Sequence, residues 1–177
     1  MGIIAKLREL EQQSIARRIP IIGSVKGKWL LDQVQKYKPK KILELGTANG
    51  YSGCILGSEG GNLTTIEVDE KIAEEAALNF AKNNINAEIL LGNGVDIIQD
   101  LVKKKLNFDL IFIDFFKKGY IKVGDNCVSL TKPGGVIIAD NISMEDCRDF
   151  AAAVLHNPKL KTEVINIGDG LSYSIRK

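Results

Sequence analysis

Two carboxylates, an amide and an ammonium follow the ends of two short apolar runs in this chain. Asp114 ends one run, Asp140 and Asn141 end the next, and Lys117 comes three residues after Asp114. If the runs are neighbouring parallel strands, these oxygens meet at one sheet edge, where they suit Mg²⁺, Ca²⁺ or Mn²⁺. An ammonium beside a bound dication loses its proton more readily, which makes Lys117 a candidate general base. The alternative is that no metal binds and that these side chains form solvated ion pairs.

A glycine-rich loop follows the first apolar run. Gly46, Gly50 and Gly53 permit a tight turn and the close approach of a ligand to a helix N-terminus. Their spacing departs from the G-x-G-x-x-G pattern of dinucleotide-binding proteins. Glu67 lies 21 residues after Gly46, where a carboxylate is placed to accept both hydroxyls of a ribose. Capping of the following helix is the alternative for Glu67, and it is our interpretation of Asp69.

A third loop, residues 91–96, ends another apolar run and contains Asn93 and Gly94. Its backbone is accessible, and in a parallel sheet it lies on the same edge as the other two loops. A plain turn with an aspartate near a helix start explains the same residues. Both interpretations stay open from this loop alone.

The chain alternates between apolar runs and helical patterns, as βαβ units do. The runs are largely continuous, as strands that are covered on both faces require. Apolar residues at helical spacing predict two amphipathic helices before the first run. The runs lie at about 41–45, 62–67, 87–91, 108–113 and 136–139.

The C-terminal part breaks this alternation. Residues 160–167 and 171–176 are joined only by Gly168, Asp169 and Gly170, a connection too short for a crossover helix. These two segments are therefore predicted to form an antiparallel hairpin at the end of a mostly parallel, open α/β sheet. We expect one domain over residues 1–177, with N-terminal helices in 1–38 and the sheet in 39–177.

Composition excludes several classes of protein. With 45% hydrophobic and 26% charged residues, the chain is neither disordered nor collagen-like, and its three scattered cysteines suggest neither a disulfide framework nor a zinc site. No apolar run is long enough to cross a bilayer, and no signal peptide is evident, so we expect a cytoplasmic protein without a membrane partner. The net charge of +2 hides a basic stretch, because residues 1–41 hold ten basic and three acidic side chains.

Three sequence blocks resemble class I S-adenosylmethionine-dependent methyltransferases, specifically the cation-dependent O-methyltransferases of the catechol and caffeoyl-CoA type. The blocks are I-L-E-L-G-T-A-N-G-Y-S at 42–52, F-D-L-I-F-I-D-F-F-K at 108–117 and P-G-G-V-I-I-A-D-N at 133–141. The similarity extends from about residue 22 to residue 141 and returns at 168–170. It implies a Rossmann-like, seven-stranded sheet with helices on both faces.

The resemblance also implies how the cofactor is held. The Gly46 loop and Ser52 would contact the methionine part of S-adenosylmethionine, and Glu67 would bind the ribose. The adenine would lie between the loop at 93–95 and Phe116. The implied cofactor contacts are Ile22, Glu44, Gly46, Thr47, Ala48, Ser52, Glu67, Val68, Asn93, Gly94, Val95, Asp114 and Phe116.

For the metal, the resemblance implies Asp114, Asp140 and Asn141 as ligands, with Lys117 as the catalytic lysine. The ion would bind an acceptor hydroxyl and a neighbouring oxygen, lower the pKa of that hydroxyl and aim the oxygen at the sulfonium methyl. Mg²⁺ is the expected ion, with Ca²⁺ or Mn²⁺ as alternatives.

The chain departs from its relatives around the acceptor site. The caffeoyl-CoA branch reads D-A-D-K where this chain has D-F-F-K at 114–117, which is nearer the catechol branch. The long insertion that many relatives carry after the Asp-Asn pair is absent, because a helix is expected at about 146–155. The glutamate that grips the second catechol oxygen has no secure counterpart. We therefore expect a shallow, open acceptor site.

Three functions remain open from the sequence. The first is methylation of a small catechol-like or vicinal-oxygen acceptor by a metal-dependent O-methyltransferase. The second is RNA methylation, in particular of tRNA, by the same centre, because a basic N-terminal stretch supplies phosphate contacts. The third is a catalytically degenerate protein that only binds S-adenosylmethionine. In many relatives, extra N-terminal helices help to form the acceptor pocket and the dimer. For this chain a homodimer is a further expectation, and the sequence leaves the oligomeric state open.

Overall fold

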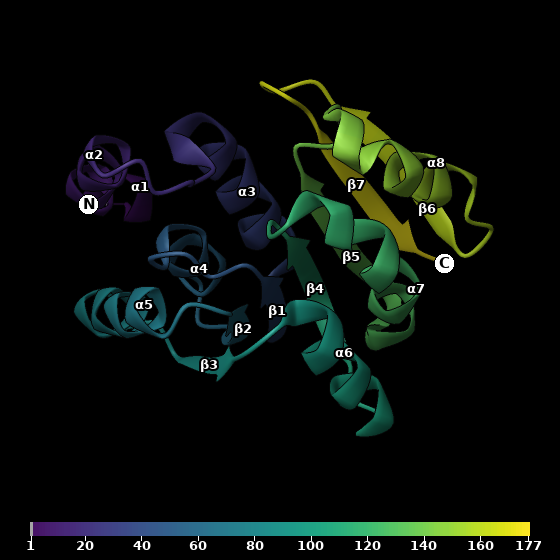
Figure 1. Ribbon diagram of the computed structural model, residues 1–177, viewed down its shortest axis with the longest axis horizontal. Helices are drawn as coiled ribbons and strands as arrows, with labels where there is room; N and C mark the ends of the chain where they lie inside the picture. Colours follow the sequence, from purple (N-terminus) through teal and green to yellow (C-terminus); the bar gives the residue numbers. More distant parts are fainter. Residues whose placement is uncertain (1) are drawn as a thin grey trace.

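The computed structural model describes residues 2–177, and its seven strands form one mixed sheet in the order β3-β2-β1-β4-β5-β7-β6 (Figure 1). Neighbouring strands from β3 to β5 are parallel, whereas β7 is antiparallel to both β5 and β6. This confirms the predicted Rossmann-like sheet with a C-terminal hairpin. The strands are β1 Lys41–Leu45, β2 Asn62–Glu67, β3 Ala87–Leu91, β4 Phe108–Ile113, β5 Thr131–Asp140, β6 Leu160–Ile165 and β7 Leu171–Arg176.

Helices cover both faces of the sheet (Figure 1). One core cluster joins α6, α7 and α8 to the sheet, and a second joins α1 to α5 to the opposite face. The helices are α1 Ile3–Lys6, α2 Arg8–Ala16, α3 Gly23–Tyr37, α4 Tyr51–Leu56, α5 Glu70–Lys82, α6 Gly94–Lys103, α7 Tyr120–Leu130 and α8 Arg148–His156, with 3₁₀ turns η1 Lys117–Gly119 and η2 Glu145–Cys147. Across residues 2–177, the helices are too short or too polar to cross a membrane.

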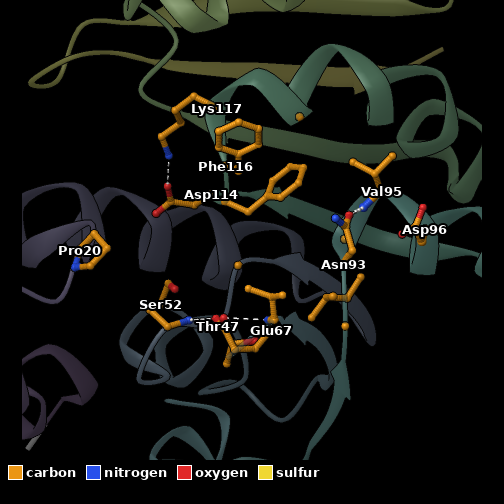
Figure 2. A pocket seen from close by; sticks show the side chains of 18 of the residues that line it. Pro20, Thr47, Ser52, Glu67, Asn93, Val95, Asp96, Asp114, Phe116 and Lys117 are labelled. Carbon is orange, nitrogen blue, oxygen red and sulfur yellow. Dashed lines mark hydrogen bonds and ion pairs between the residues drawn. The ribbon is translucent and has the colours of Figure 1, made fainter. Parts of the chain in front are cut away.

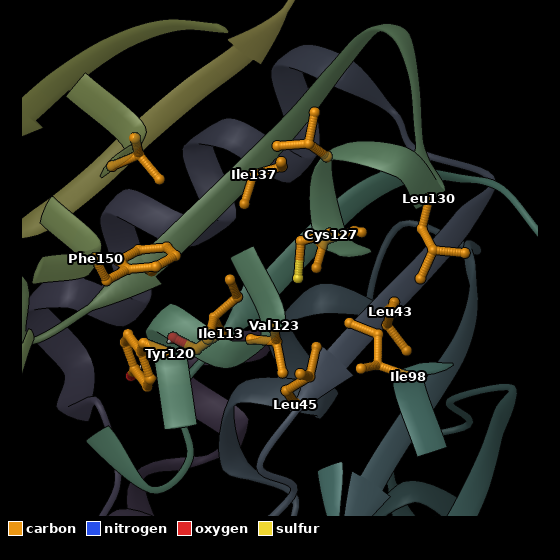
Figure 3. Packing of buried hydrophobic residues seen from close by; sticks show 14 of the residues in the cluster. Leu43, Leu45, Ile98, Ile113, Tyr120, Val123, Cys127, Leu130, Ile137 and Phe150 are labelled. Atoms are coloured by element: carbon orange, nitrogen blue, oxygen red, sulfur yellow. Dashed lines mark hydrogen bonds between the residues drawn. The ribbon is translucent and has the colours of Figure 1, made fainter. Parts of the chain in front are cut away.

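Side-chain alternation along the central strands divides the core into its two halves. In β4, Ile111 and Ile113 pack with α6 to α8, while Leu110 and Phe112 pack on the other face. Figure 3 shows Ile113 among the side chains of the first half, close to Tyr120 of α7. Because both faces are covered, the sequence of β4 is apolar apart from Asp109 near its start.

The first helix differs from its prediction. Helical spacing predicted two helices before the first strand, but residues 2–40 contain three, because the regular geometry is interrupted at Leu7 and separates α1 from α2. Leu7 has a ψ of 0° and is only 1% exposed. The local unwinding thus accompanies insertion of this side chain into the core.

The strand order reverses between β1 and β4, since β2 and β3 lie on one side of β1 and β4 and β5 on the other. Ligands of open α/β sheets bind beside such a switch point, at the carboxyl ends of the strands. Gly46 makes the two strand ends meet: its φ is +100°, and a Cβ there would lie 2.1 Å from the carbonyl oxygen of Asp114. Only glycine therefore permits this contact.

Candidate functional site

A cavity of about 710 Å³ opens at the carboxyl ends of β1, β2, β3 and β4 (Figure 2). In the view of Figure 2, Thr47 and Glu67 lie on one side of it and the Asp114–Lys117 pair on the other. Its lining is Pro20, Ile21, Gly46, Thr47, Ala48, Tyr51, Ser52, Ile66, Glu67, Val68, Gly92, Asn93, Gly94, Val95, Asp96, Asp114, Phe115, Phe116, Lys117, Gly119 and Lys122.

The Glu67 carboxylate is held in place by backbone amides. Ala48 N–H donates to Oε2 at 2.9 Å, and the N–H groups of Val68 and Asp69 donate to Oε1 at 2.8 and 3.0 Å. Ala48 reaches this position in a left-handed conformation with a φ of 43°. A carboxylate has about four acceptor sites, so Glu67 retains capacity for donors from the cavity. Its side chain therefore suits a ligand with hydroxyl groups.

Two helix caps lie at this edge of the sheet, of which only the Asp69 cap was expected. Asp69 accepts from the N–H groups of Lys71 and Ile72, which confirms the capping interpretation for this residue. Asn93 accepts from Val95 N–H at 2.8 Å and caps α6, while residues 93–95 also line the cavity. The two interpretations of this loop are thus compatible, because capping orients the backbone that faces the cavity.

Glu44 lies beneath the glycine loop and does not line the cavity. Ser52 Oγ donates to its Oε1 at 2.5 Å and Thr65 Oγ1 to its Oε2 at 2.6 Å, while Thr65 also pairs with the hydroxyl of Thr47. The side chain is fully buried, and burial raises the pKa of Glu44 to about 8. Glu44 therefore supports the loop from below, in contact with Ser52 at the cavity wall.

Most of the predicted cofactor contacts line the cavity, but two of them do not. Ile22, like Glu44, lies outside the cavity, where it packs against the second core cluster. Its neighbours Pro20 and Ile21 line the wall instead. The other predicted cofactor contacts all line the cavity. Tyr51, Asp96 and Lys122 also line it and were missed, although Tyr51 lies inside a quoted sequence block.

Lys117 is oriented by two partners at the cavity rim. Its Nζ lies 2.6 Å from Asp114 Oδ1 and donates to Tyr120 Oη at 3.0 Å. Tyr120 Oη in turn donates to the carbonyl of Ile113 at 3.1 Å, and its ring stacks on Phe115. The side chains of Lys117 and Asp114 are 20% and 18% exposed, so the ammonium is held but reachable. Sequence reasoning missed Tyr120.

Asp140 and Asn141 lie beside this rim rather than in the cavity lining. Lys26, from α3, forms ion pairs with Asp140 and with Asp169 of the β6–β7 turn. Asn141 Nδ2 donates to Asp169 as well. The pKa of Asp140 is raised by burial and then by the nearby charge of Asp114, which indicates that the two carboxylates lie within electrostatic reach of one another.

The chemistry of this donor set fits a divalent cation. Asp114 and Asp140 offer carboxylate oxygens, and Asn141 an amide oxygen, which are the ligands that hard cations prefer. Each carboxylate also pairs with an ammonium, Asp114 with Lys117 and Asp140 with Lys26, so a bound cation would share the two carboxylates with these lysines. Among residues 2–177, no three or more His, Cys, Asp or Glu side chains cluster as metal ligands, so the set depends on the amide of Asn141.

Comparison with known proteins gives consistent matches. A sequence model of the O-methyltransferase family matches residues 2–177. A catechol O-methyltransferase from Niastella koreensis is 35% identical over 122 residues, which cover 66% of this chain and 55% of that protein. The mouse catechol O-methyltransferase is 28% identical over 172 residues, covering 87% of this chain and 64% of that protein. The matched region thus spans less than two thirds of both curated relatives.

Among solved structures, an O-methyltransferase from Bacillus cereus in complex with SAH superposes with a TM-score of 0.86 and 26% identity. The superposition covers 99% of this chain and 90% of that one. The agreement extends over the sheet and the helices on both faces.

Proposed function

Because the chain belongs to the O-methyltransferase family, we propose that it transfers a methyl group from S-adenosylmethionine to a hydroxyl of a small acceptor that carries a neighbouring oxygen, as catechol does. One observation carries this proposal: a single cavity has the Glu67 carboxylate on one side and the Asp114–Lys117 pair on the other. The cofactor supplies an electrophilic methyl group. The protein has to position an acceptor oxygen and remove its proton.

On the cofactor side, Glu67 has free acceptor capacity for ribose hydroxyls. The loop from Gly46 to Ala48, with Ser52, would bind the methionine part through backbone amides and a hydroxyl. Asn93 and the residues after it would contact the adenine edge, with Phe116 against the ring. Phe116 is 67% exposed, so a flat ring has room to cover it.

On the acceptor side, Lys117 would accept the proton of the acceptor hydroxyl. Its hydrogen bonds with Asp114 and Tyr120 hold Nζ at the rim, which limits the geometries that the amine samples. Asp114, Asp140 and Asn141 would hold a divalent cation, Mg²⁺ first and Ca²⁺ or Mn²⁺ as alternatives. When bound, such a cation supplies Lewis acidity that favours the ionised form of the acceptor hydroxyl.

The acceptor side of this site is open. Only residues 141–144 separate β5 from the 3₁₀ turn η2, so no long segment between these elements covers the rim. Met144, in this short segment, is exposed. We therefore propose that the protein accepts substituted or extended vicinal-oxygen compounds as well as catechol itself.

Transfer of labelled methyl from S-adenosylmethionine to catechol, with and without EDTA, tests the proposal. Turnover that stops in EDTA and returns with Mg²⁺ is expected. Turnover that survives EDTA would refute the metal part, and cofactor binding with no turnover on any vicinal-oxygen acceptor would favour the degenerate binding protein.

The Glu67→Gln variant tests the cofactor side. It should weaken S-adenosylmethionine binding about tenfold to a hundredfold, because a charged hydrogen-bond acceptor is lost. Calorimetric titration measures this effect. Glu74→Gln, an exposed change on α5, is the matched control and should leave the affinity unchanged.

A further inference from the structure

Asp169 lies outside the cavity, on a turn that is hydrogen-bonded to the segment after the proposed metal ligands Asp140 and Asn141. Ser143 N–H donates to the carbonyl of Asp169 at 3.0 Å, and Ile142 N–H to that of Gly170 at 3.2 Å. A Cβ on Gly170 would lie 2.7 Å from Ser143 Oγ. The turn between β6 and β7 and the segment after β5 therefore form one unit, although Asn141 and Asp169 are 28 positions apart in the sequence.

The Asp169 carboxylate determines how the Asn141 amide is oriented. One carboxylate oxygen accepts from Asn141 Nδ2 and the other from Lys26 Nζ. An ionised carboxylate only accepts hydrogen bonds, so the amide must turn its nitrogen toward Asp169. The amide oxygen, which is the only atom of this side chain able to bind a hard cation, then faces the opposite way.

Lys26 acts in the same manner on Asp140. Its Nζ pairs with Asp140 Oδ1, and the same oxygen accepts from Asn141 N–H at 2.7 Å. Within residues 2–177, no hydrogen bond engages Asp140 Oδ2. One oxygen is therefore saturated by the protein while the other is left for a ligand. The Lys26 side chain is 9% exposed, so this contact is protected from solvent.

We infer that Lys26 and Asp169 are positioning residues that hold Asp140 Oδ2 and Asn141 Oδ1 in the orientation a divalent cation requires. This inference rests on the metal part of the proposed function. Outer partners that orient metal ligands commonly contribute a factor of about 10 to 100 in metal affinity. Here the ammonium of Lys26, on α3, and the carboxylate of Asp169, between β6 and β7, orient two adjacent ligands at the end of β5.

Mn²⁺ titration of the purified protein, followed by calorimetry and by the electron paramagnetic resonance of free Mn²⁺, tests the inference without turnover. Asp169→Asn leaves one acceptor oxygen where Asn141 and Lys26 now use two, so the orientation of the Asn141 amide is no longer fixed and Mn²⁺ binding should weaken about 10- to 100-fold. Lys26→Met should do the same, whereas Lys26→Arg, which keeps the cation, should recover most of the affinity. Asp146→Asn, a change at an exposed carboxylate, is the control.

A second titration separates positioning from general damage to the fold. Neither Lys26 nor Asp169 lines the cavity, so both variants should bind S-adenosylmethionine within about twofold of the wild type in the absence of metal. Unchanged Mn²⁺ affinity in Asp169→Asn, or tighter binding in Lys26→Met, would overturn the inference alone. A wild-type protein that binds the cofactor but no Mn²⁺ would overturn both the inference and the metal part of the proposed function.

Discussion

At the scale of single residues, Glu44 shows how a conspicuous side chain can serve the site without facing it. The sequence motif places it two residues before Gly46, and its hydrogen bonds to Ser52 and Thr65 tie β1, β2 and α4 together. The two hydroxyl donors favour the ionised carboxylate, whereas burial favours the uncharged carboxyl. Burial is the larger effect, so Glu44 is held in its uncharged form at neutral pH.

Glu44 makes stability depend on pH. Burial raises its pKa from 4.5 to about 8, so the folded state holds a proton that the unfolded chain releases. The contribution of Glu44 to stability is consequently fully present at and below about pH 4.5 and falls by up to about 1.4 kcal/mol per pH unit as the pH rises to 8. Glu44→Gln, which resembles the protonated form, should flatten this part of the profile. Urea unfolding at pH 5.5, 7 and 8.5 measures it.

The control for this prediction is Glu88→Gln, at an exposed position of β3. It should leave the pH profile of stability as it is in the wild type. A Glu44→Gln protein whose stability still falls between pH 5.5 and 8 by the wild-type amount would show that Glu44 stays ionised in the fold.

Lys117 is the residue with a direct chemical role in the proposed reaction. Lys117→Met should lower kcat about 10²- to 10⁴-fold, the usual contribution of a general base. S-adenosylmethionine affinity should stay within about threefold, because the cofactor contacts lie mainly on the opposite wall. Steady-state kinetics and cofactor titration separate the two effects. Lys118→Met, next in the chain and 66% exposed at its side chain, should retain full activity.

At the scale of elements, the loop after β1 depends on a backbone contact with the end of β4. Gly46 and Gly60 both have positive φ, at +100° and +83°, but only at Gly46 would a Cβ meet another atom. Alanine substitutions at these two positions therefore separate the cost of the left-handed backbone conformation from the cost of steric overlap.

Gly60→Ala should destabilise the protein by about 1–2 kcal/mol, from the left-handed conformation alone. Gly46→Ala should lose a further 1–3 kcal/mol or so, because its methyl group overlaps the carbonyl of Asp114. It should also weaken cofactor binding, which Gly60→Ala should leave intact. Denaturant unfolding and calorimetry test both statements; equal losses in the two variants would argue against a rigid contact at Gly46.

The strands could be predicted from sequence because their signals are local. The expected runs at 41–45, 62–67, 87–91 and 108–113 coincide with β1 to β4, and the Asp69 cap was read from its position alone. The partners of Lys26 could not be read in this way, because Asp140 and Asp169 lie 114 and 143 residues further along. The spacing of apolar residues along the sequence carries no information about ion pairs between residues so far apart.

At the scale of the whole molecule, the basic N-terminal stretch is partly neutralised within the fold. Arg17 forms two hydrogen bonds with Glu75, at 2.7 and 2.8 Å, and Lys26 is buried between two carboxylates. Both side chains thus already have acidic partners within the protein, which makes them less available to the phosphates of RNA. This pairing supports our proposal of a small acceptor in place of RNA.

Binding of tRNA should accordingly be weak and should show little sequence or structure preference. Filter binding at 50 and 200 mM salt measures this, since a protein with six to ten phosphate contacts loses about 10³- to 10⁵-fold in affinity over that range. Tight binding with such a steep salt dependence would instead revive the RNA acceptor.

One consequence of the α3 position concerns the energetics of ligand binding. The helix contributes Lys26 to the Asp140 rim, and Pro20 and Ile21, immediately before it, form part of the cavity wall. Any movement of α3 that accompanies filling of the cavity therefore also changes the surroundings of Asp140. Thermodynamic linkage then requires reciprocity: whatever factor the cofactor contributes to cation affinity, the cation contributes to cofactor affinity.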